Sequence, residues 1–198
     1  FSPLWGMFSL ESLTLSRTGF SDLAKTTPLT KLRFLNLVDN GVSDLTPLAS
    51  MTQLAGLGLA ENQITDLTPL AGLVQLDYLS LSKNPISDFA PLTGLTKLRN
   101  LMLRQTGLED LSFLSGLSSL VLLALGENEI HDVTPLAGLK DLRSVTLPAN
   151  QITDISPLVE AANLGEGDRL TLGDNPLSDI CLDEQIPEDH RVRIIDEA

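Results

Sequence analysis

Residues 54–75 read LAGLGLAENQITDLTPLAGLVQ, and this 22-residue unit recurs along most of the chain. Its opening leucine returns at the same interval, at Leu10, Leu32, Leu54, Leu76, Leu98, Leu120, Leu142 and Leu164. Self-similarity at a fixed period is typical of a solenoid, in which each repeat packs on its neighbours around one continuous core. The sequence therefore predicts a single elongated domain over residues 1–198, with a partial repeat (1–9), eight repeats (10–180) and a C-terminal cap of a helix and a strand (181–198).

Each unit divides into an extended part and a turn. The extended part alternates apolar and variable residues, as in Leu57-Gly58-Leu59, which is typical of a short half-buried strand. Stacked units place these strands side by side, so we expect one parallel sheet. The turn usually contains Ser/Thr-Pro-Leu, as in Thr68-Pro69-Leu70. Ser or Thr suits a helix N-cap and Pro the first helical position, which predicts a short helical turn of the 3-10 type behind the sheet.

Asparagine follows the strand in most units. A buried amide at this place can bond the backbone of its own turn and of the neighbouring turn, which predicts a structural ladder. The expected members are Asn40, Asn62, Asn84, Asn128, Asn150 and Asn175. Thr18 and Thr106 stand in this column in two units, and we expect those units to be held less firmly because a hydroxyl forms fewer hydrogen bonds.

An aspartate column precedes the helical turns. We expect it to cap backbone N–H groups, and its members include Asp44, Asp66, Asp88, Asp132 and Asp154. A calcium-binding edge is the alternative interpretation, because carboxylates suit calcium. Neighbouring carboxylates are a full repeat apart in sequence, which favours capping.

Composition restricts the classes of partner. The formal net charge is −13, with 26 acidic and 13 basic side chains, which argues against nucleic acid and anionic membranes and favours a basic partner. No apolar run approaches the roughly 18 residues of a transmembrane helix, so no membrane insertion is expected. Cys181 is the single cysteine, and His131 and His190 fall in no metal or catalytic motif. We therefore expect no cofactor, no metal and no enzymatic activity, and the sequence carries no signal of oligomeric state.

The two ends of the chain differ. Residues 2–10 align with residues 46–54, so the chain begins in the middle of a repeat, and the start lacks the features of a signal peptide. Solenoid ends need polar caps, so we expect a fragment of a longer protein or an end covered by another segment. Residues 165–167 look like a three-residue insertion in the last unit. Beyond it, the pattern predicts a short helix over 180–186 and a strand over 191–195.

The motifs resemble those of bacterial leucine-rich repeat proteins, in the 22-residue class of the internalins. The block Asp66–Leu73, nearly repeated at Asp132–Leu139, carries this similarity most clearly. The resemblance implies an α/β fold: a right-handed, curved solenoid with a concave parallel sheet and short turns on the convex side. It also implies protein recognition by a secreted or surface-exposed bacterial protein. A second branch of similar repeats is intracellular, so a segment of an intracellular regulatory or multidomain signalling protein is the alternative.

The outward strand positions are left free by the core pattern, and they are the candidate partner-binding residues. Exposed aromatic, Met and Arg residues are typical of interfaces, although single apolar residues also occur on ordinary surfaces. The candidates are Phe34, Asn36, Val38, Tyr78, Ser80, Asn100, Met102, Arg104, Leu122, Thr146 and Arg169. Gly56 and Gly58 predict a shallow slot between Phe34 and Tyr78, and the two arginines are expected to meet carboxylates of the partner. The function expected is a non-catalytic protein–protein interaction scaffold.

Overall fold

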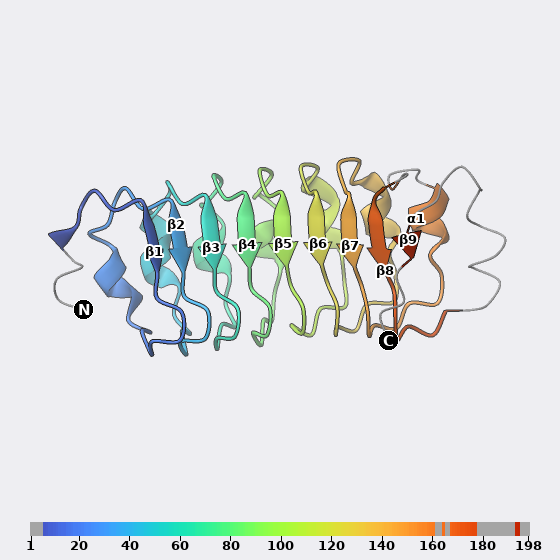
Figure 1. The fold of residues 1–198 in the computed structure, drawn as a ribbon, viewed down its shortest axis with the longest axis horizontal. Helices are drawn as coiled ribbons and strands as arrows, with labels where there is room; N and C mark the ends of the chain where they lie inside the picture. Colours follow the sequence, from blue (N-terminus) through green and yellow to red (C-terminus); the bar gives the residue numbers. More distant parts are fainter. Residues whose placement is uncertain (1–5, 161–163, 165–166, 178–192, 195–198) are drawn as a thin grey trace.

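The computed structural model describes residues 6–160, 164, 167–177 and 193–194. These residues form one sheet of parallel strands that follow one another in sequence order (Figure 1). The strands are β1 (Ser12–Thr14), β2 (Phe34–Asn36), β3 (Gly56–Gly58), β4 (Tyr78–Ser80), β5 (Asn100–Met102), β6 (Leu122–Ala124), β7 (Ser144–Thr146), β8 (Arg169–Thr171) and β9 (Arg193–Ile194). The predicted solenoid with a parallel sheet is confirmed.

The register of the sheet reproduces the sequence period. Leu35 pairs with Leu57 and Leu57 with Leu79, each a step of 22 residues. The step from Val145 in β7 to Leu170 in β8 is 25 residues, which confirms the three-residue insertion. The insertion leaves the strand pairing intact because the extra residues precede β8.

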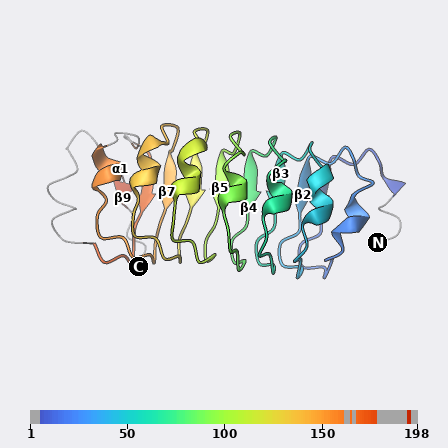
Figure 2. The same ribbon diagram turned by 180° about the vertical axis from the view of Figure 1, so that it is seen from behind.

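Short helical turns form the layer behind the sheet (Figure 2). They are η2 (Leu23–Thr26), η3 (Thr46–Ser50), η4 (Thr68–Leu70), η5 (Ala90–Leu92), η6 (Ser112–Gly116), η7 (Thr134–Gly138) and α1 (Ser156–Glu160). All but α1 are 3-10 turns, as the brevity of the segment between successive strands predicts.

These turns are capped by the predicted aspartate column and not by the predicted Ser or Thr. Thr46, Thr68 and Thr134 are the first helical residues, and η3, η4 and η7 have no side-chain hydrogen bond from their N-cap residue. The predicted Ser/Thr cap is therefore wrong. Instead, Asp66 Oδ1 accepts the N–H of Thr68 at 2.8 Å, and Asp44 does the same for Thr46 at 2.8 Å. An aspartate two residues ahead satisfies the N–H by the same local geometry that it uses in turns.

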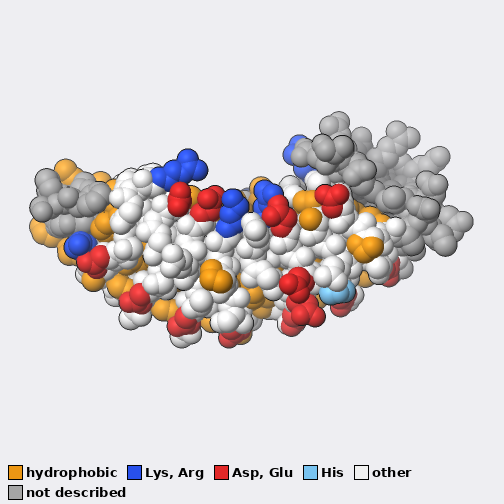
Figure 3. Space-filling view, turned by 90° about the horizontal axis from the view of Figure 1, so that it is seen from below, with side chains coloured by type: hydrophobic (Ala, Val, Ile, Leu, Met, Phe, Trp, Pro, Cys, Tyr) orange, Lys and Arg blue, Asp and Glu red, His pale blue; other side chains and the backbone are white. Residues whose placement is uncertain are grey.

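The core is a stack of leucines between the sheet and the turns. Leu54, Leu57, Leu59, Leu70 and Leu73 are all fully buried, and the equivalent residues of the other repeats join them in one cluster. Each such side chain contributes about 1.5–3 kcal/mol of burial free energy. The sheet lies on the inner side of the arc, opposite the lower outline in Figure 3, which bows outward. The repeated leucines therefore form the core and are not available to a partner.

Part of the expected C-terminal cap falls outside the described residues, including the helix over 180–186, Cys181 and His190. Within the expected strand over 191–195, Arg193–Ile194 pairs in parallel with β8. Among the described residues, no helix has the length and apolar character needed to cross a membrane.

Candidate functional site

The candidate binding surface, here called the concave face, consists of the outward side chains of β1 to β8 and the residues that follow each strand. Phe34 is 49% exposed and Tyr78 is 36% exposed, so both present large apolar area to solvent. Asn36, Val38, Asn100, Met102, Leu122 and Thr146 are half-buried, whereas Arg104 and Arg169 are exposed. Ser80 is only 9% exposed, so it offers a partner little surface.

The two glycines of β3 shape the N-terminal half of this face. A Cβ atom on Gly56 would lie 2.6 Å from Cδ1 of Phe34, and one on Gly58 would lie 3.1 Å from Cγ of Asn36. Both neighbouring side chains therefore lean over the glycines. The slot expected between Phe34 and Tyr78 exists as a recess of about 300 Å³, but Phe34 and Asn36 form part of its wall.

Asn36 also has a local role that the strand pattern does not reveal. Its Oδ1 accepts hydrogen bonds from Ser16 Oγ at 2.9 Å and from the Val38 N–H at 3.1 Å. These bonds fix the orientation of the amide beside the recess. A polar group held in one orientation adds directional specificity to an apolar surface.

Arg104 already has a partner within the chain. Its Nε donates to Glu127 Oε1 at 3.0 Å, and its Nη2 contacts the same oxygen. The repeat pattern did not reveal this pair, because Arg104 is the seventh residue of its repeat and Glu127 the eighth residue of the next, so the two are not aligned. The charge of Arg104 is thus largely compensated before any partner arrives.

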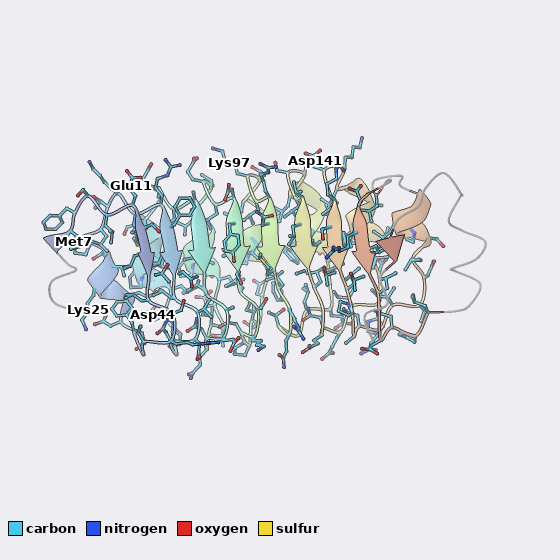
Figure 4. All side chains as sticks on the ribbon, in the orientation of Figure 1. Met7, Glu11, Lys25, Asp44, Lys97 and Asp141 are labelled. Atoms are coloured by element: carbon cyan, nitrogen blue, oxygen red, sulfur yellow. The ribbon has the colours of Figure 1, made fainter. Side chains whose placement is uncertain are left out.

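Charge is concentrated on the edges around the concave face. The outward positions from Ser12 to Gly173, each of which is a described residue, carry Arg104 and Arg169 but no acidic residue. The acids stand at the ends of the strands, where Glu61 pairs with Lys83 at 3.3 Å and Asp39 with Arg17 at 3.6 Å. Figure 3 shows Asp and Glu side chains spread over one such edge, and Glu11 and Asp141 lie along the other in Figure 4.

The asparagine column is committed to the backbone. Asn62 Nδ2 donates to Leu37 O of the preceding repeat at 3.0 Å and to Leu59 O of its own at 2.8 Å. Its Oδ1 accepts the N–H groups of Asn40 at 3.1 Å and Val42 at 2.9 Å. The other column members, Asn40, Asn84, Asn128, Asn150 and Asn175, likewise donate both to the preceding repeat and to their own turn. The column therefore has a structural role between repeats.

The aspartate column is committed in a similar way. Asp88 Oδ1 accepts the Ala90 N–H at 2.9 Å, and Asp132 and Asp154 accept the N–H of Thr134 and Ser156, each at 2.8 Å. The side-chain hydrogen bond from Thr68, with its backbone N–H, lowers the pKa of Asp66 below the ordinary value. Corresponding bonds lower the pKa of Asp44, Asp110 and Asp154. Within the described part of the chain, no group of three or more His, Cys, Asp or Glu residues is placed to hold a metal ion.

Comparisons with known proteins agree with this geometry. The family model for leucine-rich repeats (2 copies) matches residues 30–72, 52–94 and 74–119. An internalin (inlF) from Listeria monocytogenes superposes with a TM-score of 0.82 at 36% identity, over 88% of this chain and 51% of that one. This chain thus spans about half of that protein's length. No curated protein sequence matches the chain.

Two further structures are similar. Internalin C2 (inlC2) from Listeria monocytogenes has a TM-score of 0.80 at 34% identity, over 89% of this chain and 77% of that one. A leucine-rich repeat protein from Leptospira interrogans has a TM-score of 0.77 at 26% identity, over 90% and 46% of the two chains. The leucine-rich repeat fold supports a role as a protein–protein interaction scaffold. The chain belongs to the leucine-rich repeat family and is a bacterial, internalin-like member of it.

Proposed function

We propose that this chain is a non-catalytic recognition module of a secreted or surface-exposed bacterial protein, and that it binds a protein partner through the concave face. The observation that carries the proposal is the exposure of Phe34 and Tyr78 on a sheet whose core does not need them. Met102 and Leu122 extend this apolar surface across β5 and β6. Aromatic and Met side chains dominate the energetics of many interfaces.

Rigidity of the face supports the same function. β2 to β6 pair without interruption, so the side chains of Phe34, Tyr78 and Met102 stand on a preformed surface. A preformed surface binds with little loss of conformational entropy, and a few anchor residues then suffice. The acidic edges favour a partner whose basic residues surround an uncharged or apolar centre.

Binding is tested with the paired substitutions Tyr78→Ala and Met102→Ala. The partner is first captured from extracts of candidate host or neighbouring cells on the immobilised chain, and its affinity is then measured for each variant. We expect the double variant to lose at least about tenfold in affinity, since central anchors contribute about 1–2 kcal/mol each. Its thermal unfolding should change little because both side chains point away from the core.

The matched control is Val74→Ala with His131→Ala, two exposed residues outside the concave face. It should bind like the unmodified chain. Equal binding by the Tyr78/Met102 variant would contradict the assignment of the concave face.

Localisation needs a separate test. The likeness to internalins supports secretion or display, which antibody labelling of intact bacteria and of the culture medium would measure against lysed cells. Detection in the lysed fraction alone would favour an intracellular regulatory module instead.

A further inference from the structure

The boundary between residues 76–97 and 98–119, here called the Thr106 joint, differs from the other boundaries between repeats. Thr106 stands where Asn62 or Asn128 stands elsewhere, and its hydroxyl donates to Leu103 O of its own turn at 2.9 Å. The Ile86 N–H, whose counterpart Ile64 donates to the next asparagine at 3.0 Å, donates instead to Asn84 O at 2.9 Å. The same local bond occurs at Leu177, which follows Asn175 at the end of the asparagine column. The Thr106 joint therefore lacks the hydrogen bond from a backbone N–H to the asparagine of the next repeat, which is present at the neighbouring boundaries.

The backbone on the convex side of this joint is also less connected. At four other boundaries a backbone hydrogen bond joins successive repeats beyond the asparagine: Gln63 N to Val42 O at 2.8 Å, Ser87 N to Thr65 O at 3.2 Å, Glu129 N to Leu108 O at 3.0 Å and Gln151 N to Ile130 O at 2.9 Å. Among the described residues, no such bond joins 85–93 to 107–113. The strands remain paired here, since Leu81 N donates to Met102 O at 2.9 Å. The joint is thus open on the convex side only.

Two aromatic residues replace the usual residues at this opening. Phe89 occupies a column that is Leu67 and Leu111 in the adjacent repeats, and Phe113 occupies a column that is Pro91 and Pro135. Their rings stack with centroids 5.4 Å apart and an interplanar angle of 24°. Phe89 precedes η5 and is half-buried, whereas Phe113 belongs to η6 and is only 8% exposed, so Phe89 offers most of the accessible ring surface of a recess of about 490 Å³. Ile86, at its border, is 8% exposed, whereas Ile64 is fully buried.

The chemistry of the recess favours a cation with a flat, partly apolar surface. Its lining includes Asp88, Glu109, Asp110, Phe89 and Phe113, and no Lys, Arg or His is among the described residues that line it. Asp88 Oδ1 already accepts the Ala90 N–H, and Asp110 accepts the N–H and hydroxyl of Ser112, but each carboxylate keeps its negative charge and further lone pairs. The pKa of Asp110 is lowered by its bonds with Ser112, so this group is ionised at neutral pH. A guanidinium group can lie on an aromatic ring while its N–H groups meet carboxylates, and an ammonium group lacks the planar surface for this.

We propose that this recess binds an arginine side chain from a basic segment of a protein partner. The site lies on the opposite side of the molecule from the concave face, and it stands independently of the function proposed for that face. It is produced by residues that depart from the repeat at one joint: Thr106, Phe89 and Phe113. The overall charge of −13 favours the approach of such a segment.

The test uses acetyl-Gly-Arg-Gly-amide as the probe and the same peptide with citrulline in place of arginine, since citrulline keeps the shape without the charge. Binding to the full chain is followed by changes in the NMR signals of backbone amides. We expect weak binding that perturbs the amides of residues 86–93 and 107–113, and an affinity for the arginine peptide about tenfold above that for the citrulline peptide.

Phe89→Leu combined with Phe113→Pro restores the residues of the neighbouring repeats and should fold, but lose the response. Glu109→Gln should weaken binding about threefold, as expected for an exposed ion pair. The control Glu129→Gln removes an exposed carboxylate outside the recess and should bind normally. The Tyr78/Met102 variant should also bind the peptide normally, which separates this site from the concave face. Equal binding of the citrulline peptide, or full binding by the Phe89/Phe113 variant, would overturn the proposal.

Discussion

Two boundaries between repeats show what the asparagine column does. At the boundary between residues 32–53 and 54–75, here called the regular joint, the Asn62 amide bonds backbone groups of both repeats, and a further backbone bond joins Gln63 to Val42. At the Thr106 joint both connections are missing, although the leucine core and the strand pairing continue. The leucine core therefore determines how the repeats stack, whereas the asparagine amide joins the backbones of successive repeats beyond the ends of the strands.

The largest difference should appear when the amide is removed. Asn62→Ala leaves the N–H groups of Asn40 and Val42 and the carbonyl of Leu37 without their buried partner. We expect this variant to lose about 3 kcal/mol of unfolding free energy, because buried unsatisfied groups are costly. Thr106→Ala removes one hydroxyl bond and should lose about 1 kcal/mol. Chemical denaturation measures both, and equal losses would show that the two joints are held alike.

The reverse substitution should repair the weaker joint. Thr106→Asn introduces an amide that can accept the Ile86 N–H and donate to Leu81 O, as Asn84 accepts the Ile64 N–H and donates to Leu59 O. We expect a gain of about 1 kcal/mol in unfolding free energy, the net contribution of one or two added hydrogen bonds. Thr52→Asn, at an exposed position outside the asparagine column, serves as the control and should leave the unfolding free energy nearly unchanged. A loss of stability in Thr106→Asn would contradict this account.

A smaller effect should be the same at both kinds of joint. Gln105 and Ala149 precede the asparagine column position with φ of 55° and 52°, in the left-handed region that costs a residue with a Cβ atom. Gly at either place should raise the unfolding free energy by about 0.5–1 kcal/mol, after allowance for the greater freedom of Gly in the unfolded chain. Thermal unfolding of Gln105→Gly and Ala149→Gly measures this. Clearly different gains in stability for the two variants would mean that the Thr106 joint also differs in backbone strain.

The smallest effect concerns acid. The folded pKa of Asp66 at one joint and of Asp110 at the other lies below the ordinary value of 3.8. The stability that these groups contribute is therefore fully present above the unfolded pKa and is lost as pH falls through the folded pKa. Asp66→Asn and Asp110→Asn should each reduce slightly the fall in unfolding temperature below about pH 4. An unchanged pH profile in both variants would contradict the role of these hydrogen bonds.

Much of this architecture follows from the period alone. Alternation in Leu57-Gly58-Leu59 predicts a strand, and the brevity of the remaining segment predicts a 3-10 turn, because both depend on local spacing. The sequence predicted both an aspartate cap and a Ser/Thr cap, because Asp66 and Thr68 can each accept an N–H. The backbone geometry shows that Asp66 accepts it. The weaker hold at Thr106 could be predicted because a hydroxyl cannot replace an amide.

The candidate sites were less predictable because they depend on contacts between repeats. The outward positions of Phe34 and Tyr78 follow from strand alternation, but the lean of Phe34 over Gly56 depends on the neighbouring strand. The pairing of Arg104 with Glu127 and the stacking of Phe89 on Phe113 join different columns, which a column-by-column interpretation treats separately. The sequence feature that could have indicated the second site is a departure from the repeat, such as Phe113 at a position that is proline in the adjacent repeats.

Hydrogen exchange at two amides tests the central claim most directly. The Ile64 N–H is bonded to Asn84 of the next repeat, whereas the Ile86 N–H is bonded only within its own turn. We predict that the Ile86 amide exchanges at least about tenfold faster than the Ile64 amide under native conditions, and that Thr106→Asn removes most of this difference. Equal protection of the two amides in the unmodified chain would contradict the claim that the asparagine column closes the joints between repeats.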